Sequence, residues 1–311
     1  MNRTQLLACH DLIKPYIHKT AVLTSRLINA AIGAEVFFKC ENFQRMGAYK
    51  MRGATHAILK LTPEAREKGV VTHSSGNFAQ ALSLSAQMLG VKAHIVMPTT
   101  APEVKKIGVQ EYGGSIYICE PTLEARNTMA REIQEKTGAT FLHPSNDLDV
   151  ILGQGTAALE LLEEYPDLNA IFVPVGGGGL IAGTAFAAAA MGGNCRVIGT
   201  EPFEVDDAYR SLQSGKIESN LTTNTIADGL KTQLGSNTLP VILEYVNTII
   251  RVEEEEIIAA MRLIWERMKI IVEPSSAVAL AGLYRERSKF KDQKVGIIIS
   301  GGNVDLGNLP F

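Results

Sequence analysis

The sequence has few of the features that mark disulfide-rich, membrane or nucleic-acid-binding proteins. Its four cysteines lie far apart without paired spacing, which favours reduced thiols. The net charge is only −3 and the basic residues are scattered, so neither nucleic acid nor a membrane surface is expected as a partner. No apolar run is long enough to cross a bilayer, and no basic end followed by an apolar run opens the chain. These absences predict a cytoplasmic globular protein.

The motifs of common hydrolases and nucleotide-binding proteins are also missing. The six histidines show no HExxH spacing and the cysteines no CxxC spacing, so zinc hydrolase chemistry is not expected. A serine hydrolase would need a GxSxG turn, which is absent. No Lys-Ser or Lys-Thr pair follows the main glycine run, and this excludes a Walker A loop.

The 311 residues are 46% hydrophobic, which is enough for roughly two domains with buried cores. Short apolar or β-branched runs alternate with longer helical stretches, as is typical of a doubly wound α/β protein with parallel sheets. The predicted strands are Glu35–Lys39, Val70–His73, His94–Met97, Ser115–Ile118, Ala170–Val175, Arg196–Thr200, Thr248–Val252 and Val295–Ile299. The predicted helices are Gly47–Leu61, Phe78–Leu89, Pro102–Tyr112, Thr122–Thr137, Gly153–Tyr165, Gly179–Met191, Glu253–Lys269 and Ser275–Tyr284.

A run of four glycines follows the predicted strand that ends at Val175. Gly176–Gly179 carry no Cβ, so the backbone can fold tightly and bring its N–H groups against an anion. A helix begins at the last of these glycines, and the positive end of its dipole suits a phosphate. The pattern Gly-x-Gly-x-x-Ala that ends at Ala182, with Glu201 after the next strand, also fits a dinucleotide-binding fingerprint. These residues alone leave the owner of the phosphate open.

Lys50 lies at the predicted start of a helix, with glycines on either side. A positive helix end and partial burial both disfavour an ammonium group, which would leave an amine able to form a Schiff base. Two further polar loops, residues 72–80 and 300–303, follow predicted strands. Parallel sheets bind ligands at the carboxyl ends of their strands. We therefore expect these loops to line a ligand site.

Five motifs in this order resemble the fold-type II pyridoxal phosphate enzymes of the serine/threonine dehydratase and serine racemase family. They are AYKMRGA around Lys50, SSGNFAQA, GGGGL, EPSSA and SGGN, and the similarity runs from Lys39 to Asp305. The resemblance implies two doubly wound open-sheet domains of the tryptophan synthase beta-like type. Residues 1–46 and 147–311 would form the large cofactor-binding domain, with a small domain, residues 47–146, inserted into it.

The resemblance also implies roles for individual residues. Lys50 would carry pyridoxal 5′-phosphate as a Schiff base and then serve as the general base at the substrate Cα. Asn77 would hydrogen-bond the 3′ oxygen of the ring, and Ser300 would meet the ring nitrogen. Ser75 would be either a second base on the opposite face of the substrate or a residue that binds the substrate. The backbone N–H groups that would hold the phosphate belong to Gly176, Gly177, Gly178, Gly179 and Leu180.

An acidic segment after the strand Arg196–Thr200 resembles the family's divalent-cation site. The carboxylates of Glu201 and Asp207 and the carbonyl of Val205 would bind Mg²⁺ or Ca²⁺ there, the alternative being a solvated acidic turn. The run Glu253–Glu256 is instead expected to be the acidic first turn of a helix. A homodimer or higher homo-oligomer is implied by the resemblance alone.

The resemblance predicts β-elimination from a small L-hydroxy amino acid such as serine or threonine, giving a 2-keto acid and ammonia. The alternatives are a serine- or aspartate-type racemase with side dehydratase activity, a nicotinamide-dependent oxidoreductase, and a protein that only binds the cofactor. Ala48, Tyr49, Phe78 and Ser145 depart from the residues usual in the family. They leave the substrate open among serine, threonine and 3-hydroxyaspartate.

Overall fold

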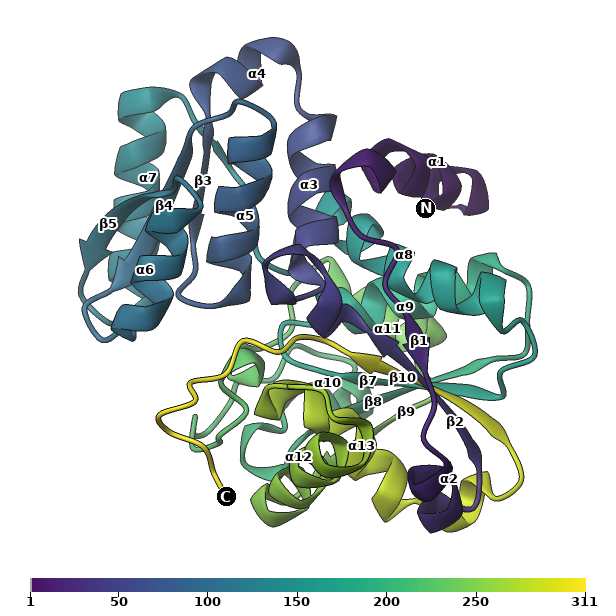
Figure 1. Cartoon of the computed structure of the whole chain (residues 1–311). Coiled ribbons are helices and arrows are strands. Elements are labelled where there is room, and N and C mark those ends of the chain that lie inside the picture. Colours follow the sequence, from purple (N-terminus) through teal and green to yellow (C-terminus); the bar gives the residue numbers. More distant parts are fainter. Residues whose placement is uncertain (1) are drawn as a thin grey trace.

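Two β-sheets organise the chain in a computed structural model that describes residues 2–311 (Figure 1). The larger sheet has six strands in the order β1-β2-β10-β7-β8-β9. Its strands are β1 (Val22–Leu23), β2 (Glu35–Cys40), β7 (Ala170–Pro174), β8 (Arg196–Pro202), β9 (Thr248–Val252) and β10 (Lys294–Ile299). All neighbours in this sheet are parallel except β1 and β2, which are antiparallel. The predicted α/β class with two open sheets is confirmed, and the antiparallel edge strand is an addition to it.

The smaller sheet has four parallel strands in the order β5-β4-β3-β6. They are β3 (Val70–His73), β4 (Ala93–Pro98), β5 (Ser115–Cys119) and β6 (Thr140–Phe141). All four fall inside the segment 47–146, and the strands of the larger sheet lie on both sides of it in the sequence. The domain boundaries at 47 and 146 themselves stay a prediction.

Helices cover both sheets and join them. They are α1 (Arg3–Ile13), α2 (Arg26–Ile32), α3 (Lys50–Lys60), α4 (Pro63–Lys68), α5 (Asn77–Met88), α6 (Glu103–Glu111), α7 (Leu123–Thr137), α8 (Leu148–Glu164), α9 (Gly179–Ala190), α10 (Asp207–Ser214), α11 (Thr238–Tyr245), α12 (Glu254–Met268) and α13 (Pro274–Arg285). Helix α3 packs against both α5 and α8, and in Figure 1 it stands between the two sheets. Helix α3, whose first residue is Lys50, therefore links the part of the molecule around the small sheet to the part around the large sheet.

The predicted strands and helices are all present, with ends that differ by a few residues. The largest difference is α8, which begins at Leu148 instead of the predicted Gly153. Asp147 explains the earlier start, because its Oδ1 accepts hydrogen bonds from the N–H groups of Asp149 at 2.8 Å and Val150 at 3.2 Å. The acidic helix start was predicted correctly, since Glu253 and Glu256 form a capping box at α12.

Close contact between α8 and α9 depends on small residues. A Cβ on Gly155 would lie 2.6 Å from the carbonyl oxygen of Gly183, which is closer than such atoms approach. The alanine-rich face of α9 is buried here against the large sheet. Glycine and alanine at this crossing therefore hold the glycine loop at the start of α9 close to α8.

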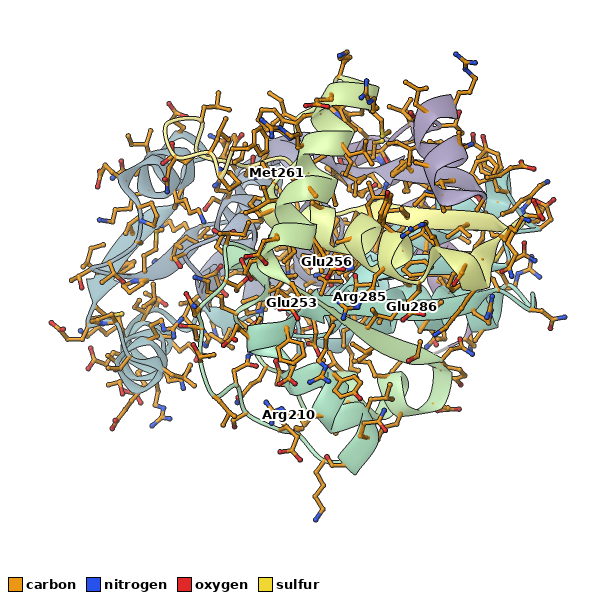
Figure 2. The ribbon with its side chains drawn as sticks, turned by 90° about the horizontal axis from the view of Figure 1, so that it is seen from below. Arg210, Glu253, Glu256, Met261, Arg285 and Glu286 are labelled. Carbon is orange, nitrogen blue, oxygen red and sulfur yellow. The ribbon has the colours of Figure 1, made fainter. Side chains whose placement is uncertain are left out.

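On the opposite face of the large sheet, Arg285 of α13 donates a 2.6 Å hydrogen bond to Glu256 of α12 (Figure 2). A cleft of about 440 Å³ runs along the edge strand β9 beside Arg285, and its lining includes none of the predicted site residues. All four cysteines are free, as predicted. No helix among residues 2–311 has both the length and the apolar character required to span a membrane.

Candidate active site

Lys50 is the first residue of α3 and lies in partly buried surroundings between aromatic rings. Its Nζ donates a 2.7 Å hydrogen bond to the carbonyl oxygen of Pro144, and it stands 5.1 Å from the ring centre of Tyr49 and 5.8 Å from that of Phe78. Burial lowers the pKa of Lys50 to about 7, although the charge of Glu273 acts in the opposite direction. A substantial fraction of Lys50 is therefore a neutral, nucleophilic amine near pH 7.

The glycine loop forms a cradle of unpaired backbone N–H groups at the start of α9. Among residues 2–311, none accepts a hydrogen bond from the N–H groups of residues 176–180. Gly178 has a φ of +82°, and a Cβ on Gly177 would lie 2.2 Å from the Ser145 Oγ. Several donors directed to one place at a helix N-terminus suit an anion. The loop thus has the chemistry that a phosphate group needs.

Asn77, the first residue of α5, belongs to a partly buried group of polar side chains that links three motifs. Its Nδ2 donates to both carboxylate oxygens of Glu273, at 2.9 and 3.0 Å, and its Oδ1 accepts from the Asn303 Nδ2 at 2.9 Å. Burial, followed by the charge of Asp228, raises the pKa of Glu273 to about 7. The sequence motifs included Glu273 and Asn303, but neither was predicted to be a site residue.

Ser300 follows β10 and is almost fully buried beside the Lys50 segment. Its Oγ lies 2.9 Å from the Ser276 Oγ, and its carbonyl oxygen accepts a 3.0 Å hydrogen bond from the Tyr49 N–H. One residue further on, Ala48 and Gly301 form a β-bridge. These contacts bring the closing motif of the chain against the segment that carries Lys50.

Ser75 lies in the loop between β3 and α5, two residues before Asn77, and is half-buried. Its Oγ forms no hydrogen bond with another residue in the described part of the chain, so it is available to a ligand. The structure thus places Lys50, Asn77, Ser300 and the glycine loop in one region. Lys50 contacts Pro144, and the next residue, Ser145, lies against Gly177 of the loop.

The acidic segment is a separate, buried group at the end of β8. Oxygens Oε2 of Glu201 and Oδ1 of Asp207 are buried without a hydrogen-bond partner in residues 2–311. The Tyr209 N–H, which would normally bond to the Val205 carbonyl in a helix, donates instead to the Glu201 Oε1 at 2.6 Å. No described group donates to the Val205 carbonyl. Three oxygens without donors are what a hard cation requires. No cluster of three or more metal-ligating side chains occurs in residues 2–311, so a cation here would need the carbonyl and water.

Burial raises the pKa of both carboxyl groups, that of Asp207 to about 6 and that of Glu201 well above its usual range. The charge of Asp207 contributes to the shift at Glu201, which places the two groups in each other's field. A bound cation would remove this penalty, so the residues fit Mg²⁺ or Ca²⁺.

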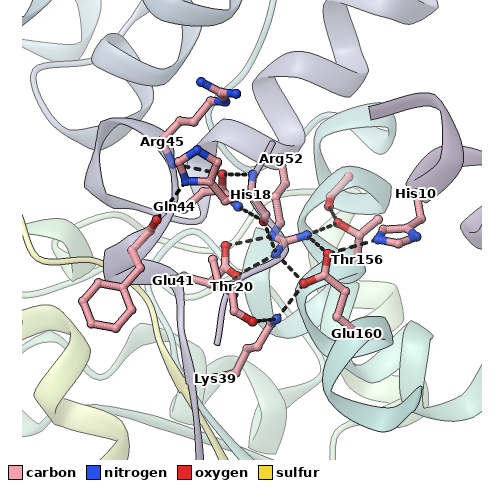
Figure 3. Close-up of polar contacts among 12 residues, drawn as sticks. His10, His18, Thr20, Lys39, Glu41, Gln44, Arg45, Arg52, Thr156 and Glu160 are labelled. Atoms are coloured by element: carbon pink, nitrogen blue, oxygen red, sulfur yellow. Dashed lines mark hydrogen bonds and ion pairs between the residues drawn. The ribbon is translucent and has the colours of Figure 1, made fainter. Parts of the chain in front are cut away.

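A buried network of charges around Arg52, which lies two residues after Lys50 on α3, was missed by sequence reasoning (Figure 3). Arg52 donates at 2.8 Å to Glu41 and at 2.8 Å to Glu160, while Lys39 donates to Glu160 at 2.6 Å and His10 lies 3.0 Å from it. Burial alone would raise the pKa of Glu160, but hydrogen bonds from His10 and Arg52 hold it far below its usual range. The carboxylates of Glu41 and Glu160 balance the charges of Arg52 and Lys39, and the network fixes the first turn of α3.

Comparisons with known proteins agree with this arrangement. The model of the pyridoxal-phosphate dependent enzyme family matches residues 13–301. A serine racemase of Dictyostelium discoideum is 50% identical over 304 residues, which cover 96% of this chain and 94% of the relative. A beta-hydroxyaspartate dehydratase of Paracoccus denitrificans is 45% identical over 306 residues, covering 98% and 97%. The crystal structure of the Dictyostelium racemase matches with a TM-score of 0.95 at 49% identity, over 98% of this chain and 99% of that one.

Proposed function

Because this chain belongs to the family of pyridoxal-phosphate dependent enzymes, we propose that it catalyses β-elimination of water from a small L-hydroxy amino acid, which gives a 2-keto acid and ammonia. The substrate HO–CHR–CH(NH₃⁺)–COO⁻ becomes R–CH₂–CO–COO⁻ and NH₄⁺, since the water lost in elimination is taken up again when the imine is hydrolysed. Serine, threonine and 3-hydroxyaspartate are the proposed substrates. The family match favours this chemistry over the nicotinamide-dependent alternative.

The observation that carries the proposal is a lysine with a pKa of about 7 beside a loop of unpaired N–H groups. In this proposal Lys50 would bind the aldehyde carbon of the cofactor, and residues 176–180 would hold its phosphate through their N–H groups. Asn77 would bind the 3′ oxygen of the ring, and the Ser300 hydroxyl would meet the ring nitrogen. When bound, the cofactor supplies an electron sink for the charge that develops at the substrate Cα.

Lys50 is proposed as the group that would remove the Cα proton of the substrate. A pKa near 7 suits this task, because the amine is then free to accept a proton at neutral pH. The rings of Tyr49 and Phe78 flank this amine and keep part of the solvent away from it. Glu273 anchors Asn77 through both oxygens, so it orients the group proposed to contact the ring.

Racemisation is the second candidate activity, because a relative that is 50% identical over nearly the whole chain is a serine racemase. A racemase needs a proton donor on the face opposite Lys50, and Ser75 is proposed for this role. Its hydroxyl forms no hydrogen bond with the described residues and stands in the loop that leads to Asn77.

We extend the proposal to the acidic segment, the domains and the assembly. Glu201, Asp207 and the Val205 carbonyl would bind Mg²⁺ or Ca²⁺. The large domain would comprise residues 1–46 and 147–311 around the small domain 47–146, and the enzyme would act as a homodimer or higher homo-oligomer.

The test is product analysis with L-serine, L-threonine and L-threo-3-hydroxyaspartate in turn, with pyridoxal 5′-phosphate and Mg²⁺ present. Keto acid with little D-isomer supports the elimination proposal and a substrate-binding role for Ser75. Abundant D-isomer that disappears in Ser75→Ala, while keto acid persists, supports the racemase. Cofactor binding without any product from the three substrates would overturn both.

A further inference from the structure

Gln154 is a buried amide with no partner in the described protein. It lies on α8 and its side chain is fully buried. Neither its Nε2 nor its Oε1 forms a hydrogen bond with any of residues 2–311. Buried amides are nearly always hydrogen-bonded, because leaving both ends unpaired costs the desolvation of two polar groups. Such a group calls for a ligand that lies outside the chain.

Two glycines make room for this side chain. Its Cγ is 3.0 Å from the point where a Cβ on Gly53 would stand, and its Oε1 is 2.6 Å from the corresponding point on Gly179. Gly53 lies one helical turn after Lys50, and Gly179 is the last glycine of the phosphate loop and the first residue of α9. The Gln154 amide is thus placed between the helix that begins with Lys50 and the cradle of unpaired N–H groups.

The atoms nearest to the Cβ positions of the four glycines in the loop belong to neutral groups. They are backbone or apolar atoms and the hydroxyls of Ser145, Thr232 and Thr238, together with Gln154. The donors on these sides of the loop are the hydroxyls and the Gln154 amide. Each of them matters to a phosphate, because none of these nearest groups offsets its charge.

We propose that Gln154 is part of the phosphate-binding site, with its Nε2 donating to the phosphate directly or through one water held between them. Its Oε1 fills the space where a side chain on Gly179 would stand, so the amide lies against the loop. This inference rests on the proposed placement of the cofactor phosphate at residues 176–180.

The test compares pyridoxal 5′-phosphate with pyridoxal, which lacks the phosphate, by equilibrium binding to the metal-loaded apoenzyme. In Gln154→Leu, we expect the affinity for pyridoxal 5′-phosphate to fall by about tenfold or more, as for loss of a hydrogen bond to a charged group. The affinity for pyridoxal should change by less than about twofold. Gln154→Glu keeps the shape but places a carboxylate beside the phosphate, so its loss should be larger.

Thr184→Val is the matched control. Thr184 lies on α9, five residues after Gly179, and its hydroxyl is likewise buried without a partner in the described residues. Its replacement should leave the ratio of the two affinities unchanged. A preserved ratio in Gln154→Leu, or an equal fall in Thr184→Val, would overturn the role of Gln154 and leave the proposed function intact.

A wild-type enzyme that binds both compounds equally well would instead overturn the phosphate site itself. Should the Gln154 variants fail to fold, the wild-type apoenzyme labelled with ¹⁵N-glutamine answers the question. Addition of inorganic phosphate should shift one side-chain amide signal that exchanges slowly with solvent, and the absence of any such shift contradicts the proposal.

Discussion

The Nζ atom of Lys50 lies 2.7 Å from the carbonyl oxygen of Pro144, which belongs to the connection between β6 and α8. His143 holds this connection, because its Nδ1 accepts hydrogen bonds from the N–H groups of Ser145 at 3.1 Å and Asn146 at 2.8 Å. Burial, with the charges of His73 and Lys50, lowers the pKa of His143 to about 4. His143 therefore stays a neutral acceptor over the physiological range and presents the Pro144 carbonyl to Lys50.

Replacing Lys50 with alanine should abolish both the visible absorption of the bound cofactor and all turnover, because Lys50 is the amine proposed to form the Schiff base. Lys60→Ala, at the exposed end of the same helix, should retain both. Absorption spectra and a keto-acid assay make the comparison. Turnover by Lys50→Ala at more than a trace of the wild-type rate would refute the assignment.

The rate at which apoenzyme captures the cofactor should rise with pH and level off just above pH 7. Burial lowers the pKa of Lys50 to about 7, so the reactive neutral amine becomes the major form above that pH. The charge of Glu273 raises this pKa, and Glu273→Gln should consequently move the midpoint to lower pH. Stopped-flow absorbance gives the profile. A rate still rising tenfold per unit at pH 9 would show that Lys50 titrates like an exposed lysine.

Breaking the buried charge network should destabilise the protein strongly. Arg52→Met leaves Glu41 and Glu160 without their shared partner in a fully buried site, for which we expect a loss of about 3–5 kcal/mol. Arg262→Met removes an exposed ion pair with Glu266 and should cost less than about 1 kcal/mol. Denaturant unfolding measures both. Similar small losses in the two variants would mean that the network contributes little.

Asp207→Asn should stabilise the metal-free enzyme and remove its response to Mg²⁺ or Ca²⁺. The folded-state pKa of Asp207 is raised to about 6, so its contribution to stability is complete below the unfolded pKa and is lost as pH rises through 6. At pH 7.5 in chelator the variant should therefore gain roughly 1–3 kcal/mol. Glu204→Gln, exposed in the same segment, is the control. An unfolding temperature of Asp207→Asn that still rises when cation is added would contradict the proposed site.

The sequence was sufficient to predict the elements that have strong local signals. Buried apolar runs located the main strands, and the four glycines located the turn into α9 because few other residues fit there. Helices such as α1 and α10 were missed, since their short amphipathic patterns are weak and their caps depend on single residues. The two-residue strands β1 and β6 exist only through their pairing with β2 and β3.

The charge network shows what sequence reasoning lacked. Its members are spread from residue 10 to residue 160, and only the folded chain brings them together. A signal was nevertheless present, because Lys39 interrupts the apolar strand β2 and Glu160 interrupts an apolar stretch of α8. Charged residues of opposite sign inside apolar runs predict a buried ion pair, but they do not predict which residues form it.

The pairing of β2 with β10 has a consequence for synthesis on the ribosome. The residues of β1 and β2 emerge early, but the parallel neighbour of β2 is β10, the last strand of the described chain. The four strands of the smaller sheet, by contrast, all lie between residues 70 and 141, so each of them pairs with a strand that is near in sequence. A nascent chain can therefore form that sheet first, before β10 has been made to pair with Phe37 and Phe38 of β2. The contacts of Lys50 with Phe78 and Pro144 come from this early part of the chain, whereas Glu273 and Ser300 reach the same site only after most of the large sheet has been synthesised.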